Sequence, residues 1–279
     1  MTSVRSAPVT IDAFGLTDRG KVRKDNEDHF LVADIHRSVN LLCGSLSADA
    51  LINRVGTTDA LLLVVADGVG GGPDGDLASE RSAAAVLSYV GGAAFCFNGL
   101  DVAGEHHLLG DLEESIQGVH QQLLKEAGGP RVKAPATTLT IVLLVWPRAY
   151  FVHVGDSRAY VRRRGQVQAL TRDQTFGEYM VSAGAWSEEQ AMRSRTAETL
   201  ASAIGGSELT PNVGLIDLEP GDSLMLCTDG LTKHVSNERI EEVLGLSLDA
   251  RAMVEQLVGE ALDAGGTDNV SVIVARGVA

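Results

Sequence analysis

Residues 138–170 read TLTIVLLVWPRAYFVHVGDSRAYVRRRGQVQAL, a stretch in which short runs of β-favouring residues follow one another with no helix-length segment between them. These predicted strands are Thr138–Val145, Tyr150–Val154, Ala159–Arg163 and Val167–Leu170. Gly165 supplies a hairpin turn between the last two strands. Connections this short reverse the direction of the chain, so the stretch predicts an antiparallel meander.

The segment before the meander contains a further predicted strand and two predicted helices. Leu61–Ala66, LLLVVA, is an apolar run of strand length that would be buried on both faces. Leu77–Val90 is rich in alanine and is followed by Gly91, as a helix would be. Asp111, with Glu114 three residues later, has the pattern of a capping box, so we expect a second helix to begin there.

The segment after the meander has helices and strands in clusters. We expect three helices: one at Ser187–Arg195, one that Asn237 caps and that runs through Leu244, and one that Asp249 caps and that runs toward Ala264. We expect two strands, at Ser223–Cys227 and Val270–Ala275. Strict alternation of strand and helix is absent, which favours an α+β fold over a doubly wound sheet. Ile35–Ala60 has weak patterning, and we expect an irregular excursion there.

The composition argues against several classes of protein. Acidic residues outnumber basic ones by 37 to 23, and the net charge of −14 makes nucleic acid an unfavourable partner. No apolar run reaches the roughly 18 residues of a membrane span, and Met1–Ile11 lacks the apolar run of a signal peptide. Cys43, Cys96 and Cys227 have no zinc-like spacing and are expected to be reduced thiols. We therefore expect a cytoplasmic protein that binds neither nucleic acid nor membrane.

Acidic residues recur beside turn-favouring residues at the ends of predicted strands. The five places are Asn26-Glu27-Asp28, Asp67-Gly68, Gly155-Asp156-Ser157, Asp229-Gly230 and Asp268-Asn269. If the strands are neighbours, these carboxylates converge, and they repel one another unless cations neutralise them. Oxygen ligands without His or Cys suit Mg²⁺ or Mn²⁺, and two such ions can share a carboxylate and clamp phosphate oxygens. Asp-Gly after a strand is commonly a simple turn, so five independent turns remain an alternative.

Other phosphate-binding and catalytic motifs fit poorly. Gly68-Val69-Gly70 has the start of a dinucleotide-binding GxGxxG loop, but Pro73 occupies its sixth position and Asp67 would place a negative charge beside the pyrophosphate. The GK[ST] of a P-loop is absent. Cys227 lacks the C-x5-R loop of a cysteine phosphatase, and we expect it to be a packing residue. His153 lies within a predicted strand and is expected to pack there and not to bind metal.

Seven motifs occur in order along nearly the whole chain: Gly15–Asp28 (GLTDRGKVRKDNED), Val65–Gly72 (VADGVGGG), Ala136–Leu139 (ATTL), Val152–Tyr160 (VHVGDSRAY), Leu170–Gln174 (LTRDQ), Leu226–Val235 (LCTDGLTKHV) and Gly265–Val270 (GGTDNV). Together they resemble the protein phosphatase type 2C family of metal-dependent phosphatases, in its bacterial form. The resemblance implies a four-layer sandwich of two central antiparallel β-sheets flanked by α-helices. It also implies an N-terminal tail over residues 1–13, a single phosphatase domain over residues 14–279 and a flap-like segment around residues 171–199.

The resemblance assigns the metal ligands by position. Asp67 matches the carboxylate that bridges two metal ions, and Gly68 matches the residue whose carbonyl oxygen binds one of them. Glu27 matches a further ligand of that ion. Asp229 and Asp268 match the protein ligands of the other ion.

The resemblance also assigns the residues around this pair of ions. Asp28 would act through a bound water, and Asn269 would orient the cluster. Asp156 matches the position that, with Asp229, holds a third and weaker metal ion in bacterial members. Arg23 matches the arginine that grips the substrate phosphate, a role that suits a guanidinium because it can pair two phosphate oxygens at once.

The implied activity is the hydrolysis of phosphoserine and phosphothreonine on proteins by a water that two Mn²⁺ or Mg²⁺ ions activate, without a phosphoenzyme intermediate. The expected partners are phosphorylated proteins that a serine/threonine kinase has modified in signal transduction, and we expect a monomer. Val69 stands where animal members carry a histidine proposed as the general acid, so the proton donor differs here. An alternative, motivated by the long Ile35–Ala60 stretch, is a regulatory module that binds phosphoprotein or a kinase without turnover as its main role.

Overall fold

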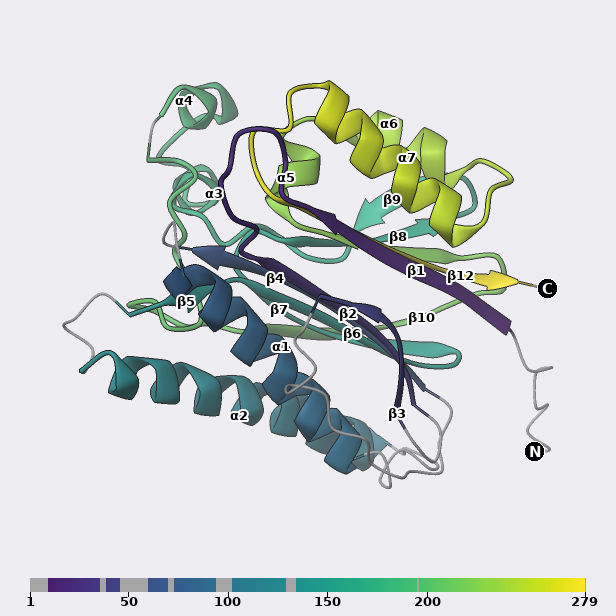
Figure 1. Cartoon of the computed structure of the whole chain (residues 1–279), viewed down its shortest axis with the longest axis horizontal. Coiled ribbons are helices and arrows are strands. Elements are labelled where there is room, and N and C mark those ends of the chain that lie inside the picture. Colours follow the sequence, from purple (N-terminus) through teal and green to yellow (C-terminus); the bar gives the residue numbers. More distant parts are fainter. Residues whose placement is uncertain are drawn as a thin grey trace.

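The computed structural model describes residues 10–35, 39–45, 60–69, 73–93, 102–128, 134–194 and 196–278. They form four layers, in which two antiparallel sheets are stacked and helices cover the outer face of each (Figure 1). The predicted α+β fold class and the four-layer sandwich are therefore confirmed. No helix in these ranges is long and apolar enough to span a bilayer.

One sheet contains the first and the last described strands. Its order is β1 (Thr10–Asp18), β12 (Val270–Val278), β11 (Ser223–Cys227), β8 (Arg158–Arg163) and β9 (Gln166–Ala169). All of its pairings are antiparallel. β1 pairs with β12 from Thr10 opposite Val278 to Asp18 opposite Val270, so segments from the two ends of the chain lie side by side.

The other sheet is formed mainly from the middle of the chain. Its order is β10 (Asn212–Asp217), β7 (Arg148–Val154), β6 (Leu139–Val145), β4 (Ala60–Val69), β2 (Asp28–Ile35) and β3 (Val39–Gly44), and the short β5 (Ala136–Thr137) pairs with the end of β4. The predicted meander is thus divided, because β6 and β7 belong to this sheet while β8 and β9 belong to the first. The chain crosses between the sheets at Gly155, where φ is 103°.

Helices cover both outer faces and one end of the sandwich. They are α1 (Pro73–Ala93) and α2 (Val102–Glu126) on the larger sheet, α5 (Asp229–Thr232), α6 (Asn237–Leu244) and α7 (Ala250–Asp263) on the smaller sheet, and α3 (Phe176–Ser182) and α4 (Glu188–Arg193) at the end of the sandwich (Figure 1). The predicted flap around 171–199 contains α3 and α4. Phe176 stacks edge-on against Trp186 within it.

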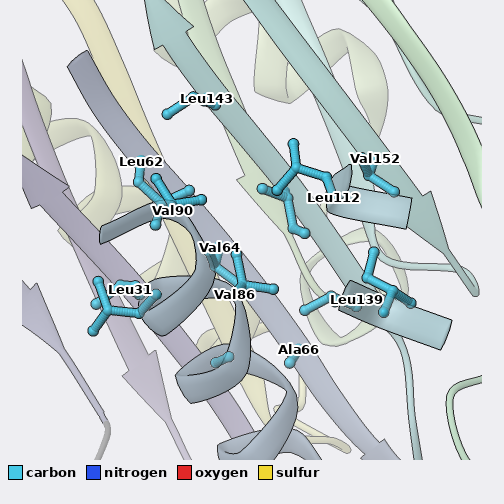
Figure 2. Close-up of a cluster of buried hydrophobic side chains, with 14 of the residues drawn as sticks. Leu31, Leu62, Val64, Ala66, Val86, Val90, Leu112, Leu139, Leu143 and Val152 are labelled. Carbon is cyan, nitrogen blue, oxygen red and sulfur yellow. The ribbon is translucent and has the colours of Figure 1, made fainter. Parts of the chain in front are cut away.

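Strand β4 is covered on both faces, which explains why its sequence is apolar throughout. Leu62, Val64 and Ala66 face α1 and α2, where they pack with side chains such as Val86 and Leu112 (Figure 2). The alternate residues, Leu61, Leu63 and Val65, belong to the separate core between the two sheets. Because both faces of the strand are covered, the run LLLVVA has no polar alternation.

Several predicted boundaries differ from the structure. α2 begins at Val102, nine residues before Asp111, so the capping-box interpretation was wrong and Asp111 lies inside the helix. Asn237 is the first residue of α6, and the cap is Ser236, whose hydroxyl accepts from the Arg239 N–H. Asp249 caps α7 as predicted.

The N-terminal part of the chain also departs from the predictions. The tail was expected to reach residue 13, but β1 begins at Thr10. The expected excursion over Ile35–Ala60 contains β3, which pairs with β2, while residues 46–59 lie outside the described residues. Neither β3 nor β10 was predicted, since each is an edge strand with little of the apolar alternation that marks a half-buried strand.

Candidate active site

Four segments meet at one end of the sandwich, where β2 begins, β4 ends, α5 begins and the loop before β12 ends (Figure 1). They contribute to the wall of a pocket of about 660 Å³. The predicted site residues that line it are Arg23, Glu27, Asp67, Gly68, Asp156, Asp229, Asp268 and Asn269. Asp28 is buried behind this wall, directly opposite Asp67 in the antiparallel pair of β2 and β4. The structure thus brings all the predicted site residues to one place.

Asp28 is held through only one of its carboxylate oxygens. Oδ2 accepts hydrogen bonds from Thr228 Oγ1 and Ser271 Oγ, both at 2.8 Å. Oδ1 is buried and has no hydrogen-bond partner among the described residues. A buried carboxylate oxygen without a donor is costly, so this atom indicates a place for a water or a cation.

Glu27 is fixed by contacts to its backbone. Its N–H donates to Asn269 Oδ1 at 2.9 Å, and its carbonyl accepts from the Gly68 N–H at 3.1 Å and from Ser79 Oγ at 2.6 Å. Its carboxylate lies against Gly75, where a Cβ would be 2.3 Å from Glu27 Oε2. Glycine at position 75 therefore leaves room for the carboxylate beside the first turn of α1.

Asn269 joins the loop before β12 to the loop before β2. Its Nδ2 donates to the carbonyls of Arg19 and Asp25 at 2.8 and 2.9 Å. Gly230 packs against the backbone of Asn269, and a Cβ at position 230 would lie 1.8 Å from the Asn269 carbonyl oxygen. Only glycine allows α5, which begins at Asp229, to approach this loop so closely.

Asp268 contacts two cationic side chains. Arg23 forms a two-pronged contact with it, from Nε to Oδ1 at 2.7 Å and from Nη2 to Oδ2 at 2.8 Å. Lys233 Nζ lies 2.9 Å from Asp268 Oδ2 and 2.6 Å from Asp229 Oδ2. The other oxygen of Asp229, Oδ1, is buried and has no partner in the part of the chain that the structure describes, as is also true of Asp28 Oδ1.

The buried carboxylates raise one another's pKa values. Burial raises the pKa of Asp67 well above its usual value, and the charges of Asp28, Asp229, Asp156 and Asp268 raise it further. Burial, with added repulsion from neighbouring carboxylates, raises the pKa of Asp28 to about 7 and the pKa of Asp156 to about 7. A cation at this place would remove the repulsion that raises these values.

The neighbouring bases compensate the negative charge of Asp268 more fully than that of Asp229. Burial raises the pKa of Asp229, and Lys233 offsets only part of that effect. Burial also acts to raise the pKa of Asp268, but the hydrogen bonds and charges of Lys233 and Arg23 together leave it below its ordinary value. The uncompensated negative charge is therefore concentrated on the most deeply buried carboxylates, those of Asp28, Asp67 and Asp156.

The donor set fits hard divalent cations. Within the described ranges, no three acidic, histidine or cysteine side chains converge closely enough to enclose an ion, and Asp229 and Asp268 each turn an oxygen toward Lys233 instead. The orphaned oxygens of Asp28 and Asp229, and the raised pKa of Asp67, nevertheless mark a place with surplus negative charge. Carboxylate and carbonyl oxygens without sulfur or imidazole are the ligands that Mg²⁺ and Mn²⁺ prefer.

Three residues of this site were not predicted from the sequence. Thr228 and Ser271 hold Asp28, and their signal was a polar residue at or within an otherwise apolar strand. Lys233 was not singled out, although it follows Asp229 by four residues, the spacing that brings side chains together on a helix.

His153 and Cys227, which were both predicted to be packing residues, are buried. His153 is fully buried in β7 and bonds to Thr140 Oγ1 at 2.9 Å and to the Arg172 carbonyl at 3.1 Å. Burial lowers the pKa of His153 to about 4. Cys227 is fully buried in the core, and burial raises its pKa to about 12, so it is a thiol and not a thiolate near neutral pH.

A sequence profile of the family described as "Protein phosphatase 2C" matches residues 36–264. The chain belongs to this family. The match covers most of the chain, although five of the predicted site residues lie outside the matched range: Arg23, Glu27, Asp28, Asp268 and Asn269. Their place at the site rests on the structure and not on the family profile.

Known members of the protein phosphatase 2C family align over nearly the whole chain. The serine/threonine protein phosphatase PstP of Mycobacterium tuberculosis is 30% identical over 260 residues, which is 93% of this chain but only 43% of that protein. The chain thus spans less than half the length of that relative. Protein phosphatase PhpP of Streptococcus pneumoniae is 29% identical over 264 residues, which is 92% of this chain and 94% of that protein.

Solved structures of this family share the fold. The serine/threonine phosphatase of S. agalactiae superimposes with a TM-score of 0.79 at 25% identity, over 96% of this chain and 100% of that one. The catalytic domain of PstP, solved in complex with two manganese ions, superimposes with a TM-score of 0.71 at 29% identity, over 98% of this chain and 100% of that one.

Proposed function

We propose that the chain is a metal-dependent protein phosphatase that hydrolyses phosphoserine and phosphothreonine on proteins. The observation that carries the proposal is the combination, in one pocket, of uncompensated buried carboxylates with an arginine at the pocket wall. The carboxylates suit divalent cations, and the arginine suits a phosphate. The names of the relatives and the manganese-bound PstP structure support the same activity.

The chain's own residues would hold two Mn²⁺ or Mg²⁺ ions. Asp67 would be shared between them; the Gly68 carbonyl and Glu27 would complete one set of protein ligands, and Asp229 and Asp268 the other. Asp28 would contribute through a water, a role that its buried, partner-free Oδ1 supports, and Asn269 holds Glu27 through a hydrogen bond to its backbone N–H. When bound, the ions would activate a water for attack on phosphorus and neutralise charge on the phosphoryl oxygens.

Arg23 would orient the substrate phosphate. Its side chain is half exposed at the pocket wall, and its guanidinium already forms a two-pronged contact with Asp268. The same planar fork suits two oxygens of a phosphate. A cation on Asp268 would compensate its charge, and the Arg23 guanidinium would then be available to pair with a substrate phosphate.

We propose direct hydrolysis without a phosphoenzyme intermediate. Cys227 is fully buried and protonated, so it is a poor nucleophile. Thr138, which lines the pocket, accepts the Asp67 N–H at 3.0 Å and shares a hydrogen bond with Ser157 Oγ at 2.8 Å. Among the described residues, neither hydroxyl is hydrogen-bonded to a basic side chain of the kind that activates a nucleophilic serine.

The substrates would be phosphorylated proteins from serine/threonine kinase signalling, acted on by a monomer in the cytoplasm. Val69 is 39% exposed at the pocket wall and cannot donate a proton, so the proton for the leaving hydroxyl would come from water. No contact among the described residues favours the alternative of a binding module without turnover.

The test is turnover of p-nitrophenyl phosphate and of matched phosphothreonine and phosphotyrosine peptides, with Mn²⁺ and with a chelator, for the wild type and for Asp67→Asn. We expect turnover only with Mn²⁺, a preference for the phosphothreonine peptide and a loss of turnover in the variant. Undiminished turnover in chelator would reject the metal-dependent reaction. A preference for phosphotyrosine would reject the substrate class alone.

A further inference from the structure

Lys233 occupies a position between acidic residues that the family resemblance assigned to metal ions. It follows α5 directly and lies four residues after Asp229, so that its Nζ comes within 2.6 Å of Asp229 Oδ2 and 2.9 Å of Asp268 Oδ2. Its side chain is only 31% exposed. The lysine is therefore built into the site and is not a mobile surface charge.

The two oxygens of Asp229 have different surroundings. Oδ2 is taken by Lys233, while Oδ1 is buried and has no partner. Asp229 can thus offer Oδ1 to a core ion that it would share with Asp67 and Asp268, without giving up the lysine contact. The outer side of Asp229, by contrast, is already compensated by a fixed positive charge.

Asp156 is the acid that would share a further ion with Asp229. Asp156, Asp229 and Lys233 all line the main pocket, and all three also line a neighbouring pocket of about 520 Å³ beside α3 and α4. The lysine ammonium occupies Asp229 Oδ2, the oxygen that faces away from the partner-free Oδ1, in a wall that it shares with Asp156.

We propose that the ammonium of Lys233, which occupies Asp229 Oδ2, replaces a third metal ion that Asp229 and Asp156 would otherwise share, so that this chain binds two divalent ions and not three. The proposal rests on the two-ion centre of the proposed function. A divalent ion on Asp229 Oδ2 would lie within a few ångströms of Nζ and would be repelled by it. The fixed charge makes the outer position independent of the metal concentration in solution.

The test counts bound Mn²⁺ per chain by equilibrium dialysis followed by elemental analysis. We expect two ions for the wild type and for Lys233→Arg, which keeps the charge. We expect a third, weaker ion for Lys233→Met, which keeps the length of the side chain but removes the charge. The double variant Lys233→Met with Asp156→Asn is expected to return to two ions, because the third ion then loses a carboxylate ligand.

A matched control removes a charge elsewhere. Lys125 is exposed near the end of α2, and Lys125→Met changes the net charge by the same amount, so it is expected to leave two ions. Equal numbers of ions in the wild type and in Lys233→Met would overturn the inference while leaving the two-ion centre intact. A wild type that binds no Mn²⁺ would overturn the proposed function as well.

A second measurement uses the wild type alone and therefore does not depend on whether Lys233→Met folds. Anomalous diffraction from wild-type crystals soaked in Mn²⁺ is expected to show no peak between Asp156 and Asp229. A peak there, with Lys233 turned away from Asp229, would overturn the inference.

Discussion

Asp28 and Asp67 lie directly opposite each other in neighbouring antiparallel strands, β2 and β4. Like charges in this arrangement destabilise a sheet, and here both residues are buried. Asp28 has two hydroxyl donors on one oxygen and none on the other. The pair therefore destabilises the folded state. Such a loss of stability is expected for residues that bind a ligand and do not contribute to folding.

Asp67→Asn is expected to stabilise the metal-free protein while abolishing turnover. The substitution removes one charge from a cluster in which burial and mutual repulsion raise the pKa of Asp67, so we expect the free energy of unfolding to increase. Turnover with Mn²⁺ is expected to fall by more than about 100-fold, since changes to residues behind metal ligands alone cost 10–100-fold. Urea unfolding in chelator and phosphatase assays measure the two effects. A variant that is less stable and still active would contradict this account.

The metal-free protein is expected to lose stability as pH rises from about 4 to about 7 and to change little above that. Asp28 and Asp156 have pKa values of about 7 when folded, against about 3.9 in an unfolded chain. The folded state therefore holds more protons than the unfolded state in this window, and deprotonation favours unfolding. Thermal unfolding in chelator at pH 5 and pH 8 measures the effect. Asp156→Asn should reduce the difference, and a midpoint that increases with pH would contradict the assignment.

Arg23→Ala is expected to raise KM for p-nitrophenyl phosphate by about tenfold or more. A charge-assisted hydrogen bond contributes about 1.5–3 kcal/mol, and about 1.4 kcal/mol corresponds to a factor of ten. Arg23→Lys should recover only part of the loss, because an ammonium cannot make the two-pronged contact. Arg193→Ala, on the exposed α4, is a control that removes the same charge outside the pocket. Equal effects of Arg23→Ala and Arg193→Ala would show that Arg23 acts only through net charge.

Gly75→Ala is expected to weaken Mn²⁺ binding more than it affects folding. A Cβ at position 75 would lie 2.3 Å from Glu27 Oε2, so the carboxylate must move. Gly118→Ala, on α2, is the matched control because a Cβ there meets no atom within 4 Å. That variant should gain about 0.5–1 kcal/mol of stability from helix propensity and bind Mn²⁺ normally. Calorimetric titration with Mn²⁺ separates the two variants, and equal Mn²⁺ affinities would remove Glu27 from the site.

The strands with buried, apolar faces could be predicted from the sequence, but of the strands at the edges of the two described sheets only β9 was predicted. Ser223–Cys227 was predicted with its observed bounds because every side chain in it is buried. β10 was missed because its outward residues, such as Val213 and Leu215, are as apolar as its inward ones. The split of the meander into two sheets depends on the turn at Gly155, which no periodicity reveals.

The acidic residues of the site could be named from the sequence, but their bonding could not. The spacing of Asp67 and Asp229 beside strand ends indicated a shared location, which the register and the pocket supply. That Asp28 keeps an oxygen without a partner, and that Lys233 bridges two acids, depends on contacts between residues distant in the sequence. Such contacts follow from the packing of the two sheets and of α5 and not from any local pattern.

Anomalous scattering from crystals grown with Mn²⁺ tests the central claim most directly. We predict two peaks about 3.5–4 Å apart, both within bonding distance of the Asp67 carboxylate, with Asp229 and Asp268 next to one peak and Glu27 next to the other. An absence of anomalous peaks beside Asp67, in crystals of protein that is active under the same conditions, would contradict the account.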